Sequence, residues 1–178
     1  EIMEKVWLAS YPEGVPELIP DPPYSSLTDM INACMKKYAS RKAYTNMGSS
    51  ITFGELDELS NRFAHYLLFE LNLKKGDRVA IMLPNVNQYP IALCGILKAG
   101  LVVVNVNPLY TPRELKHQLS DSRAKTIIIL ENFANVLSEV IHETSIVKVI
   151  LTKMGDMLSF PKNHIVNFVV KHIKKLVS

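Results

Sequence analysis

Four short runs of almost continuous apolar residues recur along the chain between residues 78 and 152 and alternate with helical patterns. They are Arg78 to Leu83, Leu101 to Val106, Lys125 to Leu130 and Val147 to Thr152. Short runs rich in valine and isoleucine, without polar alternation, are typical of strands buried on both faces of a sheet. Because helical segments separate the runs, the pattern predicts an α/β fold with a mostly parallel sheet flanked by helices.

Capping sequences mark where two of the helices begin. Thr52 is followed three residues later by Glu55, and Thr111 is followed by Glu114 with Pro112 between them. This spacing is that of a capping box, and proline is favoured at the first helical position. The proline-punctuated stretch NVNPLYTPREL is therefore interpreted as a strand-to-helix connection. A further helix is expected from Asn132 to about His142.

The chain divides into an arm and a packed domain. Residues 1–25 hold five of the ten prolines, which predicts an extended arm lying outside the packed domain. The domain is expected to span residues 26–178 and to open with a helix capped by Ser26. After that helix, a short strand at KAYTN and a turn at MGSS lead to the helix that follows Thr52.

Composition narrows the class of protein. With 178 residues, 48% hydrophobic and 21% charged, the chain resembles one ordinary globular domain. A net charge of +3, spread along most of the chain, predicts no nucleic-acid partner. Cys34 and Cys94 stand in apolar helical patterns, which predicts reduced thiols, a cytoplasmic location and no metal site. Neither a signal peptide nor a membrane-spanning segment is expected.

Polar side chains that could bind a ligand follow two of the predicted strands. Asn85, Asn87 and Gln88 follow the strand that begins at Arg78, where open parallel sheets present ligand-binding groups. The alternative is that they cap the next helix and bridge backbone groups. Asn107 and Tyr110 follow the next strand and have no predicted capping role. Since glycine-rich phosphate loops and the G-x-S-x-G motif are missing from the sequence, no catalytic residue is assigned.

The segment from His164 to Ser178 predicts an amphipathic, basic helix. Its aliphatic residues fall on one arc of a helical wheel, and Lys171, Lys174 and Lys175 fall on the far side. Two interpretations remain open. The apolar arc could lie in a membrane interface with the lysines at the surface, or it could pack on the core of the protein.

Taken in order, ITFGELDELSNRFAHYL, LKKGDRVAIMLPNVNQYPIALCGILKAG, VVNVNPLYTPRELKHQLSDS and VILTKMGD resemble the opening region of the AMP-forming acyl-CoA synthetases, and bacterial long-chain fatty-acid CoA ligases in particular. The resemblance covers nearly the whole chain. It implies the first subdomain of the N-terminal domain of an adenylate-forming enzyme. It also implies an enzyme that uses ATP, Mg²⁺ and coenzyme A to convert a long-chain fatty acid through an acyl-adenylate into acyl-CoA.

The same resemblance implies that the catalytic groups lie outside this sequence. The phosphate loop, the Asp that binds the ribose and the lysine of the C-terminal domain have no counterparts here, so the fragment alone is predicted to be inactive. Basic residues that bind coenzyme A in some relatives are replaced by ENFANVL. Peripheral contact with the cytoplasmic face of the inner membrane and a homodimer are further expectations. The alternatives are a ligase for medium-chain or aryl acids, and a stand-alone binding module.

Overall fold

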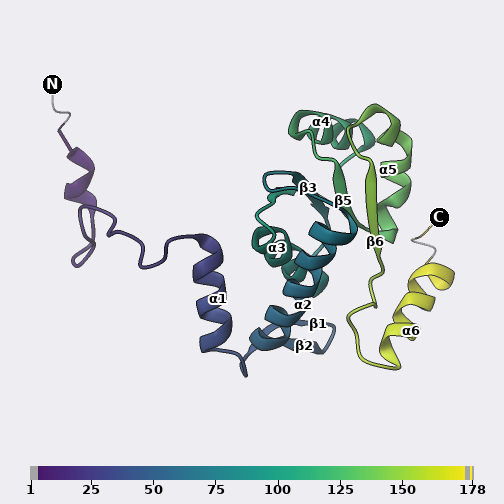
Figure 1. Ribbon diagram of the computed structural model, residues 1–178, viewed down its shortest axis with the longest axis horizontal. Coiled ribbons are helices and arrows are strands. Elements are labelled where there is room, and N and C mark those ends of the chain that lie inside the picture. The colour runs from purple at the N-terminus through teal and green to yellow at the C-terminus, as the bar shows by residue number, and fades with distance from the viewer. Residues whose placement is uncertain (1–3, 175–176, 178) are drawn as a thin grey trace.

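The computed structural model describes residues 4–174 and residue 177, and its centre is a four-stranded sheet (Figure 1). Its strands are β3 (Arg78–Met82), β4 (Val102–Asn105), β5 (Thr126–Leu130) and β6 (Lys148–Thr152). The strand order is β4-β3-β5-β6 and every neighbouring pair is parallel. The predicted α/β fold with a parallel sheet is confirmed, and each strand lies inside its predicted range.

Alternate residues of the central strands enter two separate cores. Val79 and Ile81 pack with α2 (Phe53–His65) and α3 (Gln88–Lys98) on one face. Ala80 and Met82 pack with α4 (Pro112–Ser122) and α5 (Ala134–Val140) on the other. All four strand residues are buried, as expected where successive side chains of a strand point to opposite faces of a covered sheet.

The predicted helix starts are present. The Thr111 N–H donates to Glu114 Oε2 at 2.8 Å, and the Glu114 N–H donates to Thr111 Oγ1 at 3.4 Å. Thr52 and Glu55 form the same reciprocal pair at the start of α2. Each pair satisfies two backbone donors that would otherwise lack partners at a helix terminus. Thr111 thus begins α4, and NVNPLYTPREL is a strand-to-helix connection.

A small antiparallel hairpin precedes α2 and lies at its N-terminal end, where the capping box is. It joins β1 (Lys42–Asn46) to β2 (Ser49–Thr52) through Met47 and Gly48, which both have positive φ. Two residues of this conformation form the tight turn that best matches the twist of a hairpin. The expected turn at MGSS was therefore too long, because its two serines belong to β2. The preceding helix, α1 (Leu27–Lys37), is capped by Ser26 as predicted.

Two other helical predictions need correction. The helix expected from Asn132 to about His142 is divided into η3 (Glu131–Phe133), α5 and η4 (Ile141–Glu143), where η3 and η4 are 3-10 turns. The helix expected from His164 to Ser178 starts earlier, as α6 (Lys162–Phe168), and continues as the π-helical turn η5 (Val169–Ile173). A similar π-helical turn, η2 (Tyr66–Glu70), follows α2.

Two parts of the chain remain outside the packed layers. Residues 4–25 contain one 3-10 turn, η1 (Val6–Ser10), are almost entirely exposed, and extend away from the domain in Figure 1. At the other end, β6 is an edge strand of the described sheet. Its side chains Val149 and Leu151 are exposed, as is Val147 just before it. An uncovered apolar sheet edge of this kind is normally shielded from association.

Candidate functional site

The order of the strands identifies the edge of the sheet where a ligand would bind. From β3 the chain crosses to β4 on one side and then returns past β3 to β5 on the other. In open α/β sheets, ligands bind outside the carboxyl ends of the strands at such a reversal. The loops at this edge follow β3, β4, β5 and β6. Asn107 belongs to the loop after β4, and Gln88 is the first residue of α3, directly after the loop that follows β3.

Gln88, a predicted ligand-binding residue, connects two elements of the fold. As the first residue of α3, it donates from Nε2 to Thr152 Oγ1 at 3.2 Å and to the Lys153 carbonyl at 2.8 Å. Its Oε1 is buried and meets no hydrogen-bond donor in the described part of the chain. The amide therefore joins the start of α3 to the end of β6, and Gln88 also lines an adjoining cavity.

That cavity is apolar and has a volume of about 370 Å³. It lies between α2, α3 and the β5–β6 side of the sheet, and its walls include Leu59, Phe63, Ile91, Ile128, Ile150 and Met157. Thr152 and Gln88 supply polar groups on the wall, and Arg62 lies at the same cavity. The chemistry of this lining suits an apolar group that carries one hydrogen-bond donor.

The two asparagines before Gln88 support backbone structure. Asn87 is buried and donates from Nδ2 to the Ser49 carbonyl at 3.2 Å, which joins the loop after β3 to the hairpin. Asn85 receives a hydrogen bond from Asn46 Nδ2 at its own carbonyl, at 2.8 Å. Bridging of backbone groups by the side chain is confirmed for Asn87. For Asn85 the bond is made by its backbone carbonyl, and the role of its side chain stays a prediction. Capping by Asn87 is wrong, because its side chain makes no cap hydrogen bond to α3.

Asn107 and Tyr110 shape the connection between β4 and α4. The Leu109 N–H donates to Asn107 Oδ1 at 3.0 Å, and the Tyr110 N–H donates to the Asn107 carbonyl at 3.1 Å. The Tyr110 ring packs against the core on the α4 face of the sheet. Tyr110 and Gln88 line different cavities, so the structure does not bring the four candidates, Asn85, Gln88, Asn107 and Tyr110, together in one site.

A polar network after β6 was missed by the sequence analysis. Asp156 Oδ2 accepts hydrogen bonds from Thr152 Oγ1 at 3.0 Å and from the Lys153 N–H at 2.7 Å. Asp156 Oδ1 accepts from Asn167 Nδ2 at 3.2 Å. The sequence signal was the turn TKMGD, in which a threonine and an aspartate flank the residues they fold back on. This network fixes the route of the chain from β6 to α6.

Burial and hydrogen bonding shift the pKa values of three titratable groups. A backbone hydrogen bond from Thr111, followed by one from its hydroxyl, lowers the pKa of Glu114. The equivalent bonds from Thr52 lower the pKa of Glu55. Burial raises the pKa of the Cys94 thiol. A neutral thiol in an apolar setting is not a nucleophile, in agreement with the prediction that Cys94 is a reduced core residue.

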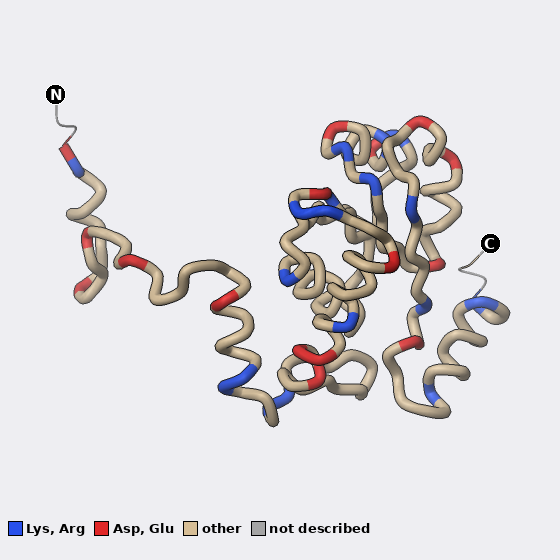
Figure 2. Tube along the Cα trace, in the orientation of Figure 1, with Lys and Arg blue, Asp and Glu red and all other residues tan. Residues whose placement is uncertain are grey.

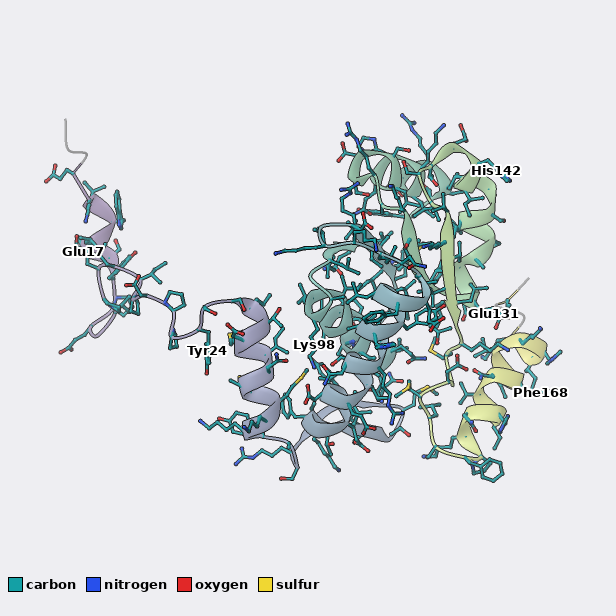
Figure 3. The ribbon with its side chains drawn as sticks, viewed as in Figure 1. Glu17, Tyr24, Lys98, Glu131, His142 and Phe168 are labelled. Atoms are coloured by element: carbon teal, nitrogen blue, oxygen red, sulfur yellow. The ribbon has the colours of Figure 1, made fainter. Side chains whose placement is uncertain are left out.

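The ion pair with the most buried cation joins the two helices on one face of the sheet. Lys98, labelled in Figure 3, donates from Nζ to Asp57 Oδ1 and to Asn61 Oδ1 on α2. Its side chain is only 5% exposed, whereas that of Asp57 is 42% exposed. Because Lys98 extends from the end of α3 into α2, its role is to hold these helices together.

The described residues contain no cluster of three or more His, Cys, Asp or Glu side chains able to hold a metal ion. The residues present therefore do not fit the Mg²⁺ that the resemblance implies, and no Mg²⁺ ligand is assigned to them. In residues 4–174 and 177, no helix is both long enough and apolar enough to span a bilayer. Lys171 and Lys174 are exposed in and after η5, and Lys175 lies outside the described residues.

Comparisons with known proteins agree with this geometry. A long-chain-fatty-acid–CoA ligase of Escherichia coli O6:H1 is 57% identical over 98% of this chain, which spans 31% of that relative. The crystal structure of a long-chain-fatty-acid-CoA ligase from Archaeoglobus fulgidus matches 88% of this chain and 32% of its own, with a TM-score of 0.70 and 24% identity. A benzoate CoA ligase from Burkholderia xenovorans matches 70% of this chain and 25% of its own, with a TM-score of 0.65 and 26% identity.

The family description "AMP-binding enzyme" matches residues 31–173, which include all four strands of the parallel sheet. The chain spans about a third of the length of the curated relatives it matches. The sheet and its flanking helices are thus shared with adenylate-forming CoA ligases, and the chain belongs to the AMP-binding enzyme family.

Proposed function

We propose that this chain is part of an ATP-dependent long-chain fatty acid:CoA ligase. The observation that carries the proposal is 57% identity along 98% of the chain with a protein named a long-chain-fatty-acid–CoA ligase. In the proposed reaction, a carboxylate oxygen of the fatty acid bonds to the α-phosphorus of ATP and pyrophosphate leaves. The thiol of coenzyme A then bonds to the acyl carbon, and AMP leaves.

The part of this reaction that the chain supplies is structural support. Gln88, Asn87 and Asp156 hold the loops at the carboxyl edge of the sheet through bonds to Lys153, Ser49 and the β6–α6 turn. Mg²⁺, when bound, would neutralise charge on phosphate oxygens, through ligands that lie elsewhere. We also propose the division into an arm of residues 1–25 and an α/β subdomain of residues 26–178.

A ligase for another acid is the second candidate, favoured by the similarity to a benzoate CoA ligase. The test is exchange of labelled pyrophosphate into ATP by the gene product that carries this sequence, with palmitate, octanoate and benzoate compared at equal concentration. Faster exchange with palmitate supports the proposal. Faster exchange with octanoate or benzoate supports the second candidate. A lack of exchange with every acid would favour a stand-alone binding module.

We further propose that the enzyme works at the cytoplasmic face of the inner membrane. A long-chain fatty acid partitions into lipid, and the basic region that holds Lys171, Lys174 and Lys175 suits anionic headgroups. Sedimentation with anionic vesicles tests this contact, and recovery of all the protein in the supernatant at low salt would contradict it. A homodimer stays a prediction.

A further inference from the structure

The chain fixes α6 to the end of β6 by a polar clasp. We use this name for Gly155, Asp156 and Asn167. The Gly155 N–H donates to Asn167 Oδ1 at 2.7 Å, and Asn167 Nδ2 donates to Asp156 Oδ1 at 3.2 Å. Asp156 is itself held by Thr152 and by the Lys153 N–H. The side chain of Asn167 thereby connects α6 to the turn after β6 through both the oxygen and the nitrogen of its amide.

Close packing at Gly155 determines which flank of α6 faces the domain. A Cβ on residue 155 would lie 2.6 Å from the Asn163 carbonyl oxygen and 2.8 Å from Asn167 Oδ1. Only glycine allows the backbone of the helix to approach so closely. The Asn163 backbone and the Asn167 side chain, one turn apart on the helix, consequently lie against the turn.

Large apolar side chains of this segment are exposed. Phe160, Ile165, Phe168 and Ile173 are between 56% and 81% exposed, and we call them the outer ridge. Figure 3 shows Phe168 on the side of α6 that faces away from the sheet. Val166 and Val169 of the predicted apolar arc are half-buried, so the choice between the two sequence interpretations stays a prediction. Exposed apolar clusters of this kind mark contact surfaces.

The charge around the outer ridge selects the kind of partner. From Met157 to Ser178 the sequence has four lysines and no Asp or Glu, so this segment alone exceeds the net charge of +3 of the whole chain. Figure 2 shows basic but no acidic positions along α6. A basic helix with outward bulky apolar side chains matches an anionic bilayer, where lysines meet headgroups and apolar side chains enter the acyl boundary.

We propose that the outer ridge inserts into the interface of an anionic membrane and that the clasp holds α6 in the orientation this requires. The inference rests on the proposed membrane contact, and it adds which side chains enter the lipid and what positions them. Asn167 is a positioning residue in this arrangement. The lysines then contact the headgroups around the inserted side chains. Membrane binding therefore depends on Phe168 as well as on charge.

Vesicle sedimentation of the chain tests the ridge. The vesicles contain phosphatidylglycerol with phosphatidylethanolamine, and pure phosphatidylcholine vesicles are the comparison. We expect Phe168→Ser to weaken binding to the anionic vesicles about tenfold. The matched control is Phe69→Ser, because Phe69 is 64% exposed and contacts a histidine ring, as Phe168 does. We expect Phe69→Ser to bind like the wild type.

A fluorescence measurement tests insertion directly. Phe168→Trp is made in the Trp7→Phe background, so that the new indole is the single tryptophan of the chain. We expect a blue shift with anionic vesicles and quenching by brominated lipid. Asn167→Ala keeps every lysine but breaks the clasp. In that background we expect several-fold weaker binding and a smaller blue shift, with faster hydrogen exchange confined to residues 162–173.

The outcomes separate the two proposals. If the wild type does not sediment with anionic vesicles, the proposed membrane contact is wrong. If it sediments but Phe168→Ser binds equally and the indole introduced by Phe168→Trp stays in water, the ridge is wrong and lysines alone account for binding. If Phe168→Ser weakens binding while Asn167→Ala does not, the positioning role of the clasp is wrong. Self-association through α6 without vesicles, abolished by Phe168→Ser, would assign the ridge to a second copy and overturn its assignment to lipid.

Discussion

Thr111 supplies the side-chain oxygen that accepts a hydrogen bond from the Glu114 N–H in the first turn of α4. Replacing it by alanine leaves the Glu114 N–H without this partner, so Thr111→Ala should lower the free energy of unfolding by about 1 kcal/mol. Urea denaturation measures the change. Ser138→Ala, on the exposed side of α5, is the control and should have a smaller effect. A large loss of ligase turnover in the longer gene product at unchanged stability would show that the loop before α4 acts in catalysis.

Glu114 makes part of this stability depend on pH. Its pKa is lowered in the folded state from the ordinary value of 4.5, so its contribution is present above that value and is lost as pH falls through the folded pKa. Glu114→Gln retains a capping acceptor without the charge. The stability difference between the wild type and Glu114→Gln should therefore shrink between about pH 7 and about pH 3. Urea midpoints at the two pH values measure it, and an unchanged difference would contradict the assignment.

At the scale of elements, α2 and α3 are joined through a buried lysine. Asp57→Ala removes the carboxylate and leaves the Lys98 ammonium buried, which should cost on the order of 3 kcal/mol. Lys98→Met removes the buried charge instead, and the half-exposed Asp57 can then turn to water. We expect Lys98→Met to be the less destabilising of the two in urea denaturation. The reverse order would mean that Lys98 is stabilised mainly by other groups.

Local patterns were enough to predict the strands and the capped helices, because their signals lie within a few neighbouring residues. β2 was missed because two of its four residues are serines, and its pairing with β1 stabilises a strand that local preference does not favour. The partners of Gln88 were also beyond prediction. Thr152 lies 64 positions away, and only the crossover from β3 to β6 brings it close.

At the scale of the molecule, we predict that the chain is a scaffold, because it spans 31% of a curated relative and the resemblance places the groups that stabilise the transferring phosphate outside it. We expect the purified chain to show no fatty-acid-dependent exchange of pyrophosphate into ATP, because acyl-adenylate formation needs preorganised charge at that phosphate. The longer gene product serves as the positive control. Exchange by the chain alone, above the level with acid omitted, would overturn this prediction.

Hydrophobic periodicity alone could not predict which side of α6 faces the rest of the domain. The helical wheel separated apolar from polar residues, but it did not say which side meets the domain. That choice depends on Asn167, a residue of the polar side, and on the missing Cβ of Gly155. Both contacts join residues of the turn to residues of the helix beyond it, so they depend on how the turn after β6 folds.

The order of the strands in the sheet also determines when β3 can pair with each of its neighbours during synthesis. Val104, which pairs with Ala80 of β3, follows it after 24 positions, whereas Ile127, its partner on β5, follows after 47. At bacterial and eukaryotic elongation rates, the second partner leaves the ribosome about 2 to 10 seconds after Ala80. Throughout that interval one edge of β3, a largely buried strand, has unpaired N–H and C=O groups, which invite pairing with other chains. The amphipathic α6 emerges after β6, when the sheet that anchors it can already be complete.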